Sequence, residues 1–147
     1  MLARLCALSV VAIAALAPAV ALACDGEGGA AHMASVGTIS APELANLLDH
    51  KEAKLKVVDA NSSATRAKEG VIPGAFLLTS LASFDPAKDL SAAKTDEVVF
   101  YCHSVKCGAS HQAAEKALQA GFTDVKVMPE GIVGWKAAGK KVATPQS

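Results

Sequence analysis

Short apolar runs alternate with stretches of helical periodicity along this chain. Residues 97–101 (EVVFY) form the clearest run, rich in β-branched and aromatic residues, as expected for a strand buried on both faces of a parallel sheet. Residues 55–59 and 124–128 predict two further short strands. A fourth apolar run, 76–78, follows the turn sequence at 72–75 (IPGA), where the proline favours extended backbone.

Helical segments are predicted between these strands. A helix begins after Ser40, because Ser40 and Glu43 form a capping-box pair and leucines recur behind them at helical spacing. Residues 109–120 place alanine and leucine on one face and charged or amide side chains on the other, and Gly121 then ends the helix. A short helix follows at 131–139. Strands that alternate with helices predict an α/β sandwich built on a parallel sheet.

The N-terminus has the pattern of a targeting segment. Arg4 precedes an uncharged run, 5–17, that is apolar except for Ser9, and a small-residue pattern ends at residue 23, so residues 1–23 are predicted to be a secretory signal peptide. Residues 24–37 are rich in glycine and alanine without an apolar period, and we expect a flexible tether. Residues 38–147 then form the folded domain. The protein is therefore expected to be exported, either to a periplasm or as a secreted protein.

Two other fates of the N-terminus would tether the protein to a membrane. The apolar stretch at 5–23 is nearly long enough to span a bilayer if it is not cleaved. Alternatively, Cys24 could carry a lipid, although Ala21 holds the place where a leucine-like residue is expected. A membrane is a predicted partner in these two cases only.

Charge and length narrow the class of protein. The 147 residues suit about one domain, and 14 basic residues balance 14 acidic ones. This balance argues against a nucleic-acid partner, because phosphate binding normally shows as a basic stripe. Cleavage after residue 23 would leave Cys24, Cys102 and Cys107 in an oxidising compartment, and the odd number leaves one thiol free.

The candidate chemistry lies at Cys102, directly after the 97–101 strand. Ligands of open α/β sheets bind at such strand ends, where backbone N–H groups and the start of a helix face an anion. The predicted site is Cys102 with the loop that follows it: His103, Ser104, Val105, Lys106, Cys107, Gly108 and Ala109. The helix start and the cation of Lys106 are expected to lower the pKa of Cys102 below its ordinary value of about 8.5. Such a cradle would also hold a persulfide.

Several alternatives remain open for these residues. Cys102 could be an inert buried thiol, and Cys107 could either resolve an oxidised Cys102 through a disulfide or only shape the loop. Acyl transfer would need a histidine base, and nothing fixes His103 or His111 in that role. The same two cysteines and two histidines could bind zinc or copper(I), but their spacing matches structural zinc sites weakly. We expect no metal and no cofactor.

The chain resembles the rhodanese-like (sulfurtransferase) domains over roughly residues 38–143. The resemblance rests on these motifs in order: VVDAN at 57–61, GVIPGA at 70–75, FYC ending at Cys102, AGF at 120–122 and GIVGWKAAGKKV at 131–142. It implies a three-layer sandwich with a mainly parallel sheet flanked by helices. It also implies that Cys102 takes up sulfur from thiosulfate or a polysulfide and passes it to a thiol acceptor, which could be a protein. Asp59 resembles the structural aspartate of the family, with Arg66 nearby.

The loop departs from the family pattern in one respect that bears on the donor. The family has an arginine shortly before the Ser or Thr that opens the helix. Here that place is taken by Cys107, counted from Cys102, or by Ala109, counted from Ser110. The loss of the arginine favours a larger or less charged sulfur donor, or a protein thiol. A second interpretation is a redox or sulfur-carrier module in which Cys102 and Cys107 form a disulfide without turnover of a small donor.

Overall fold

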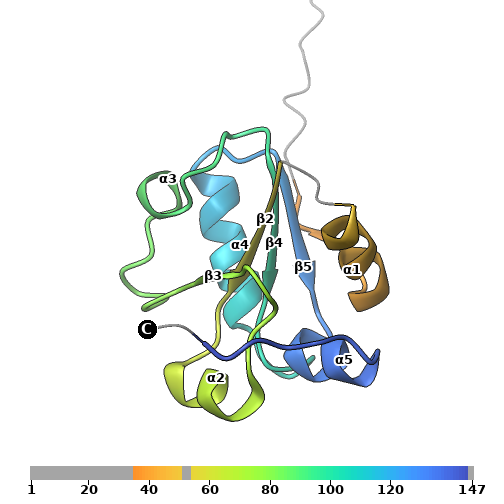
Figure 1. Ribbon diagram of the computed structural model, residues 1–147. Helices are drawn as coiled ribbons and strands as arrows, with labels where there is room; N and C mark the ends of the chain where they lie inside the picture. Colours follow the sequence, from red (N-terminus) through yellow and green to blue (C-terminus); the bar gives the residue numbers. More distant parts are fainter. Residues whose placement is uncertain (1–34, 51–53, 146–147) are drawn as a thin grey trace, which may run out of the picture. The chain divides into compact units, whose positions relative to one another are not determined.

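The computed structural model describes residues 35–50 and 54–145 of the chain (Figure 1). The predicted signal peptide at 1–23 and residues 24–34 of the predicted tether lie outside the described residues. Gly37, the last residue of that tether, already belongs to the first strand, β1. None of the helices in the described ranges is long and apolar enough to cross a membrane.

The centre of the fold is a five-stranded sheet in the order β1-β5-β4-β2-β3, and every pair of neighbouring strands is parallel. Its strands are β1 (Gly37–Thr38), β2 (Leu55–Asp59), β3 (Phe76–Leu77), β4 (Glu97–Tyr101) and β5 (Asp124–Met128). Asp59, Tyr101 and Met128 end the three longest strands side by side in register. The loops that follow these strands therefore share one edge of the sheet.

Helices cover both faces of the sheet, as the α/β sandwich predicts. Helices α1 (Ala41–Asp49) and α5 (Gly131–Ala137) lie on one face, and α3 (Pro86–Asp89) and α4 (Ala109–Gln119) lie on the other (Figure 1). The remaining helix, α2 (Ser63–Glu69), lies beyond the carboxyl end of β2.

Strand β4 shows why the sheet needs cover on both sides. Its side chains alternate, so Val98 and Phe100 pack against the α4 side while Val99 and Tyr101 pack against the α1 and α5 side. All four are fully buried. The continuous apolar run at 97–101 is thus explained by two separate cores, one on each face of the sheet.

Local sequence signals account for most element ends. The capping box at α1 is confirmed, since Glu43 N–H donates to the Ser40 hydroxyl and Ser40 N–H donates to the Glu43 carboxylate. The predicted stop after α4 is also confirmed, because Gly121 has a φ of +91°, a region that favours glycine. Asp85 caps the short helix α3, because its carboxylate accepts a hydrogen bond of 3.1 Å from the Ala87 N–H.

The C-terminal segment pairs with the chain that follows α2. Val71 and Ala143 form an antiparallel bridge, with N···O distances of 3.0 and 2.8 Å in its two hydrogen bonds. Gly70 approaches Val142 so closely that a Cβ there would lie 2.9 Å from it, and the Gly70 φ of +78° also favours glycine. The bridge fixes the segment before Ile72, which contacts the end of β4.

Candidate active site

Cys102 directly follows β4, and the first turn of α5 holds its backbone. The carbonyl oxygens of Cys102 and His103 accept hydrogen bonds from the N–H groups of Ile132 and Val133, at 2.8 and 3.1 Å. Gly131 permits this approach, because a Cβ at that position would lie 2.5 Å from the Cys102 carbonyl oxygen. Its φ of +62° also favours glycine. Helix α5 therefore fixes where the loop begins.

The Cys102 sulfur lies among hydrogen-bond acceptors. Its thiol faces the carbonyl oxygen of Cys107 at 3.1 Å and that of Ser104 at 4.0 Å, and it lies 3.3 Å from the Ser110 hydroxyl. The residue is only 1% exposed. Burial raises the pKa of Cys102, as does its contact with the Cys107 side chain, while the hydroxyl and N–H of Ser110 oppose the shift. The surroundings favour the neutral thiol.

The Cys107 sulfur has the opposite environment. Cys107 is partly exposed, and its backbone N–H donates to the Ser104 carbonyl at 2.9 Å in the turn that shapes the loop. Partial burial alone would raise the pKa of Cys107. The pKa is nevertheless lowered, because the Cys102 thiol and the backbone N–H groups of His103 and Ala109 stabilise the thiolate.

These environments correct the expectation that the loop amides and Lys106 activate Cys102. Two of the amides serve Cys107 instead, and the pKa of Cys102 is raised because burial outweighs the hydrogen bonds from Ser110. Lys106 and Val105 are exposed at the tip of the loop, with Val105 74% exposed. The expectation failed because a sequence shows that a loop supplies N–H groups but does not show at which sulfur they point.

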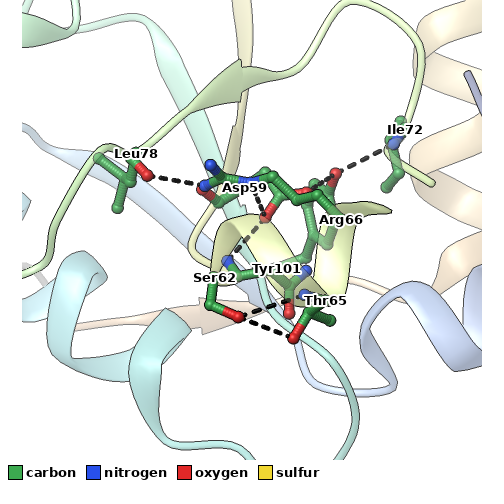
Figure 2. Close-up of polar contacts among 8 residues, drawn as sticks. Asp59, Ser62, Thr65, Arg66, Ile72, Leu78 and Tyr101 are labelled. Atoms are coloured by element: carbon green, nitrogen blue, oxygen red, sulfur yellow. Dashed lines mark hydrogen bonds and ion pairs between the residues drawn. The ribbon is translucent and has the colours of Figure 1, made fainter. Parts of the chain in front are cut away.

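A buried ionic network lies at the ends of β2 and β4 and includes Tyr101, the residue before Cys102 (Figure 2). Asp59 is fully buried, and its Oδ2 accepts a hydrogen bond of 2.6 Å from the Tyr101 hydroxyl. Its Oδ1 accepts one of 2.6 Å from the Asn61 N–H and lies 3.2 Å from Nε of Arg66. The Tyr101 hydroxyl in turn accepts from the Ile72 N–H at 3.0 Å.

Arg66 completes this network. Its Nη2 donates to the carbonyl oxygens of Asp59 and Leu78, both at 2.8 Å, and the residue is 7% exposed. Figure 2 shows the guanidinium group enclosed between these partners. Asp59 and Arg66 thus tie β2, α2 and the end of β3 together, and the guanidinium group is occupied by structural contacts rather than directed at the thiols.

The four residues of the metal alternative do not form a metal site in the described part of the chain. No three His, Cys, Asp or Glu side chains within residues 35–50 and 54–145 converge in a geometry that could hold a metal ion. His111 is exposed on α4.

Ser110 is the contact residue that sequence reasoning left out of the site. Its hydroxyl lies against the Cys102 sulfur although it belongs to the first turn of α4, eight residues later. The signal was available in the resemblance, which places a serine or threonine at the start of this helix. The support from α5 carried no such signal, because it uses backbone atoms of Ile132 and Val133.

Comparisons with known proteins agree with this architecture. The family model described as the rhodanese-like domain matches residues 40–138. A search of curated proteins found no match. Among solved structures, the rhodanese-like domain of an Anabaena protein is 22% identical with a TM-score of 0.62, and the match covers 76% of this chain and 81% of that one.

Two further solved structures differ in what their names state. A Rhodopseudomonas palustris protein described as a possible tyrosine phosphatase is 24% identical, with a TM-score of 0.62 over 74% of this chain and 85% of its own. The 3-mercaptopyruvate sulfotransferase SseA of Escherichia coli is 16% identical, with a TM-score of 0.60 over 77% of this chain and 52% of its own. At these identities the likeness concerns the fold.

Proposed function

The chain belongs to the rhodanese-like domain family, and on that premise we propose that it is an exported sulfurtransferase. In this proposal a persulfide forms on Cys102, and its outer sulfur passes to a thiol acceptor. The family match over residues 40–138 and the fold shared with a sulfotransferase support the reaction class. Export rests on the pattern of residues 1–23 alone.

The observation that carries the proposal is the pair of free thiols where β4 meets α4. A thiolate attacks the outer sulfur of thiosulfate or of a polysulfide, forming a new S–S bond. The S–S bond of the donor breaks, and sulfite or a shortened polysulfide leaves with the electron pair. A thiol acceptor then takes the same sulfur from the enzyme. Both steps are exchanges between sulfur atoms and need no general base on a neighbouring histidine.

The charged residues of the loop indicate which class of sulfur donor the site can bind. A small dianion is usually bound by arginine, whose planar fork pairs with two oxygens at once. The loop between Cys102 and α4 contains Lys106 but no arginine, and Arg66 is held by Asp59 and Leu78. We therefore propose a polysulfide or a protein persulfide as the preferred donor over thiosulfate. The same shortage disfavours a phosphate ester as substrate.

One observation favours a second candidate function. The Cys102 sulfur lies 3.1 Å from the carbonyl oxygen of Cys107, and each cysteine side chain shifts the pKa of the other, so two free thiols lie close together in one loop. In an oxidising compartment such a pair could close to a disulfide and act as a redox or sulfur-carrier module without turning over a small donor.

Intact mass measured after polysulfide treatment, before and after reductant, separates the two functions. The proposed function predicts a reducible gain of one sulfur atom that is absent from the Cys102→Ser, Cys107→Ser double variant. Transfer of that sulfur to cyanide or a thiol should require Cys102. Unchanged turnover by Cys102→Ser would sink the proposal. A loss of two hydrogens that needs both cysteines, without sulfur gain, would establish the redox module instead.

A further inference from the structure

The two sulfurs of the site face opposite kinds of hydrogen-bonding groups. Cys102 faces the carbonyl oxygens of Cys107 and Ser104, and an acceptor oxygen 3.1 Å from a sulfur favours its protonated form. Cys107 faces the N–H groups of His103 and Ala109, which favour a thiolate. The first cysteine of the loop is therefore arranged to keep its proton, and the second is arranged to lose it.

Solvent exposure also favours Cys107 over Cys102 as the residue that a donor reaches first. Cys102 is 1% exposed beneath the loop, whereas Cys107 is partly exposed within it. The nearby tip residue Val105 is 74% exposed, so the loop itself faces solvent. A donor that arrives from solution meets the Cys107 sulfur before it can reach Cys102. Nucleophilic attack needs both a thiolate and an open approach, and the lowered pKa and partial exposure of Cys107 favour both.

We propose that Cys107 is the thiolate that first takes sulfur from the donor, and that Cys102 receives the sulfur from Cys107 in a two-thiol relay. This inference rests on the proposed sulfur transfer. It differs from the expectation that Cys102, the first cysteine of the loop, takes the sulfur directly from the donor. The donor class is a polysulfide or persulfide whose outer sulfur can enter a shallow loop.

Both steps of the relay balance without an oxidant. The Cys107 thiolate attacks the outer sulfur of the donor, a new S–S bond forms, and the remainder of the donor leaves as a thiolate or shortened polysulfide. Cys102 then attacks the outer sulfur of the Cys107 persulfide, and the bond between that sulfur and Cys107 breaks. The proton of Cys102 passes to the departing Cys107 sulfur. The transferred sulfur keeps its oxidation level throughout.

The first test uses the wild-type chain and no donor. Iodoacetamide in limiting amount should alkylate Cys107 before Cys102. When the alkylation rate of each cysteine is measured against pH, Cys107 should reach half of its maximal rate at a lower pH than Cys102. Lys106 lies between the cysteines, so cleavage by trypsin after Lys106 places them in separate peptides for mass spectrometry. Earlier alkylation of Cys102 would overturn the inference, and this readout does not depend on whether the protein transfers sulfur.

The second test follows the sulfur with inorganic polysulfide as the probe. In wild type, a persulfide should appear on the Cys107 peptide first and on the Cys102 peptide later. Cys107→Ser should slow loading of Cys102 by about tenfold or more, and Cys102→Ser should leave a persulfide trapped on Cys107.

Three outcomes would contradict the relay. Equal loading of Cys102 in Cys107→Ser and in wild type would overturn the relay but leave the proposed function intact. Closure to a disulfide with release of sulfide would overturn the second step. No sulfur on either peptide would overturn both the relay and the proposed function.

Discussion

The Tyr101 hydroxyl donates a hydrogen bond of 2.6 Å to Oδ2 of Asp59, across the boundary between β4 and β2. Because Tyr101 is the residue before Cys102, the bond fixes the backbone from which the candidate nucleophilic loop departs. The same hydroxyl accepts from the Ile72 N–H, so the segment that follows α2 is fixed to the same point. The position of the thiols thus depends on a buried carboxylate that does not touch them.

Replacing Asp59 by Asn should strongly destabilise the fold. The variant leaves the buried guanidinium of Arg66 without its carboxylate partner, and removing one member of a buried pair costs about 3–5 kcal/mol. Urea unfolding followed by far-UV circular dichroism measures the loss. Glu69→Gln, which breaks the more exposed pair with Lys136, is the matched control and should change stability less. Similar midpoints for the two variants would contradict a structural role for Asp59.

The single tyrosine of the chain should make stability fall at high pH. Burial and the nearby Asp59 raise the pKa of Tyr101 above its ordinary value of about 10. A group whose folded pKa is raised contributes its full stability below the unfolded pKa and loses it as the pH rises beyond that value. Above about pH 10 this one group should reduce the free energy of unfolding by about 1.4 kcal/mol per pH unit.

The alkaline prediction is checked by titrating tyrosinate absorbance beside circular dichroism. Tyrosinate should appear only as the protein unfolds, and Tyr101→Phe should show a shallower pH dependence. Tyrosinate that forms while the fold is intact would contradict the buried placement of the hydroxyl.

Gly131→Ala should disturb the loop more than an equivalent change elsewhere. Gly131 and Gly139 both have positive φ, so alanine at either position carries the backbone cost of about 1–2 kcal/mol. Only at Gly131 would the new Cβ meet the backbone of Cys102 and His103 at 2.5 Å, since nothing lies within 4 Å at Gly139. We expect an additional loss of about 1–3 kcal/mol for Gly131→Ala.

Thermal or urea unfolding of the two glycine variants measures that difference. The order of iodoacetamide labelling should also change in Gly131→Ala but persist in Gly139→Ala. Equal losses in the two variants would show that backbone strain alone explains both, without contact between α5 and the loop.

Ser110→Ala should make Cys102 a weaker acid. The Ser110 hydroxyl lies 3.3 Å from the Cys102 sulfur and lowers its pKa against the larger effect of burial, so its removal should raise the pKa further. A hydrogen bond of about 1 kcal/mol corresponds to roughly a fivefold slower alkylation of Cys102 below its pKa. The pH dependence of alkylation in a Cys107→Ser background gives the measurement. Ser104→Ala is the control, because Ser104 meets the sulfur through its carbonyl oxygen, which the variant keeps.

The fold was largely predictable because most of its strands coincide with short apolar runs in the sequence. The bounds of β2, β4 and β5 agree with the apolar runs at 55–59, 97–101 and 124–128, and the capping box marks the start of α1. Helix α2 escaped prediction because it has only seven residues, of which Arg66 alone is buried. Its position depends on an ionic contact with Asp59, which leaves no apolar period in the sequence.

The sequence predicted where the site lies, but it did not predict which of the two thiols faces hydrogen-bond donors and which faces acceptors. Position at a strand end located Cys102 and its loop, and the structure brings both cysteines together there. The orientation of individual N–H and C=O groups depends on the turn at 104–107 and on anchoring by α5. Those are contacts between backbone atoms, so residue types alone could not show which thiol faces donors and which faces acceptors.

The strand order also determines when, during synthesis, the two thiols acquire their different surroundings. Strand β1 pairs only with β5 in this sheet, so the sheet cannot be completed during synthesis until residue 128 has been made. The N–H groups of Ile132 and Val133, which hold the start of the loop, emerge later still. A nascent chain therefore presents Cys102 and Cys107 as two ordinary cysteines, and the difference between them arises only once β5 and α5 have assembled.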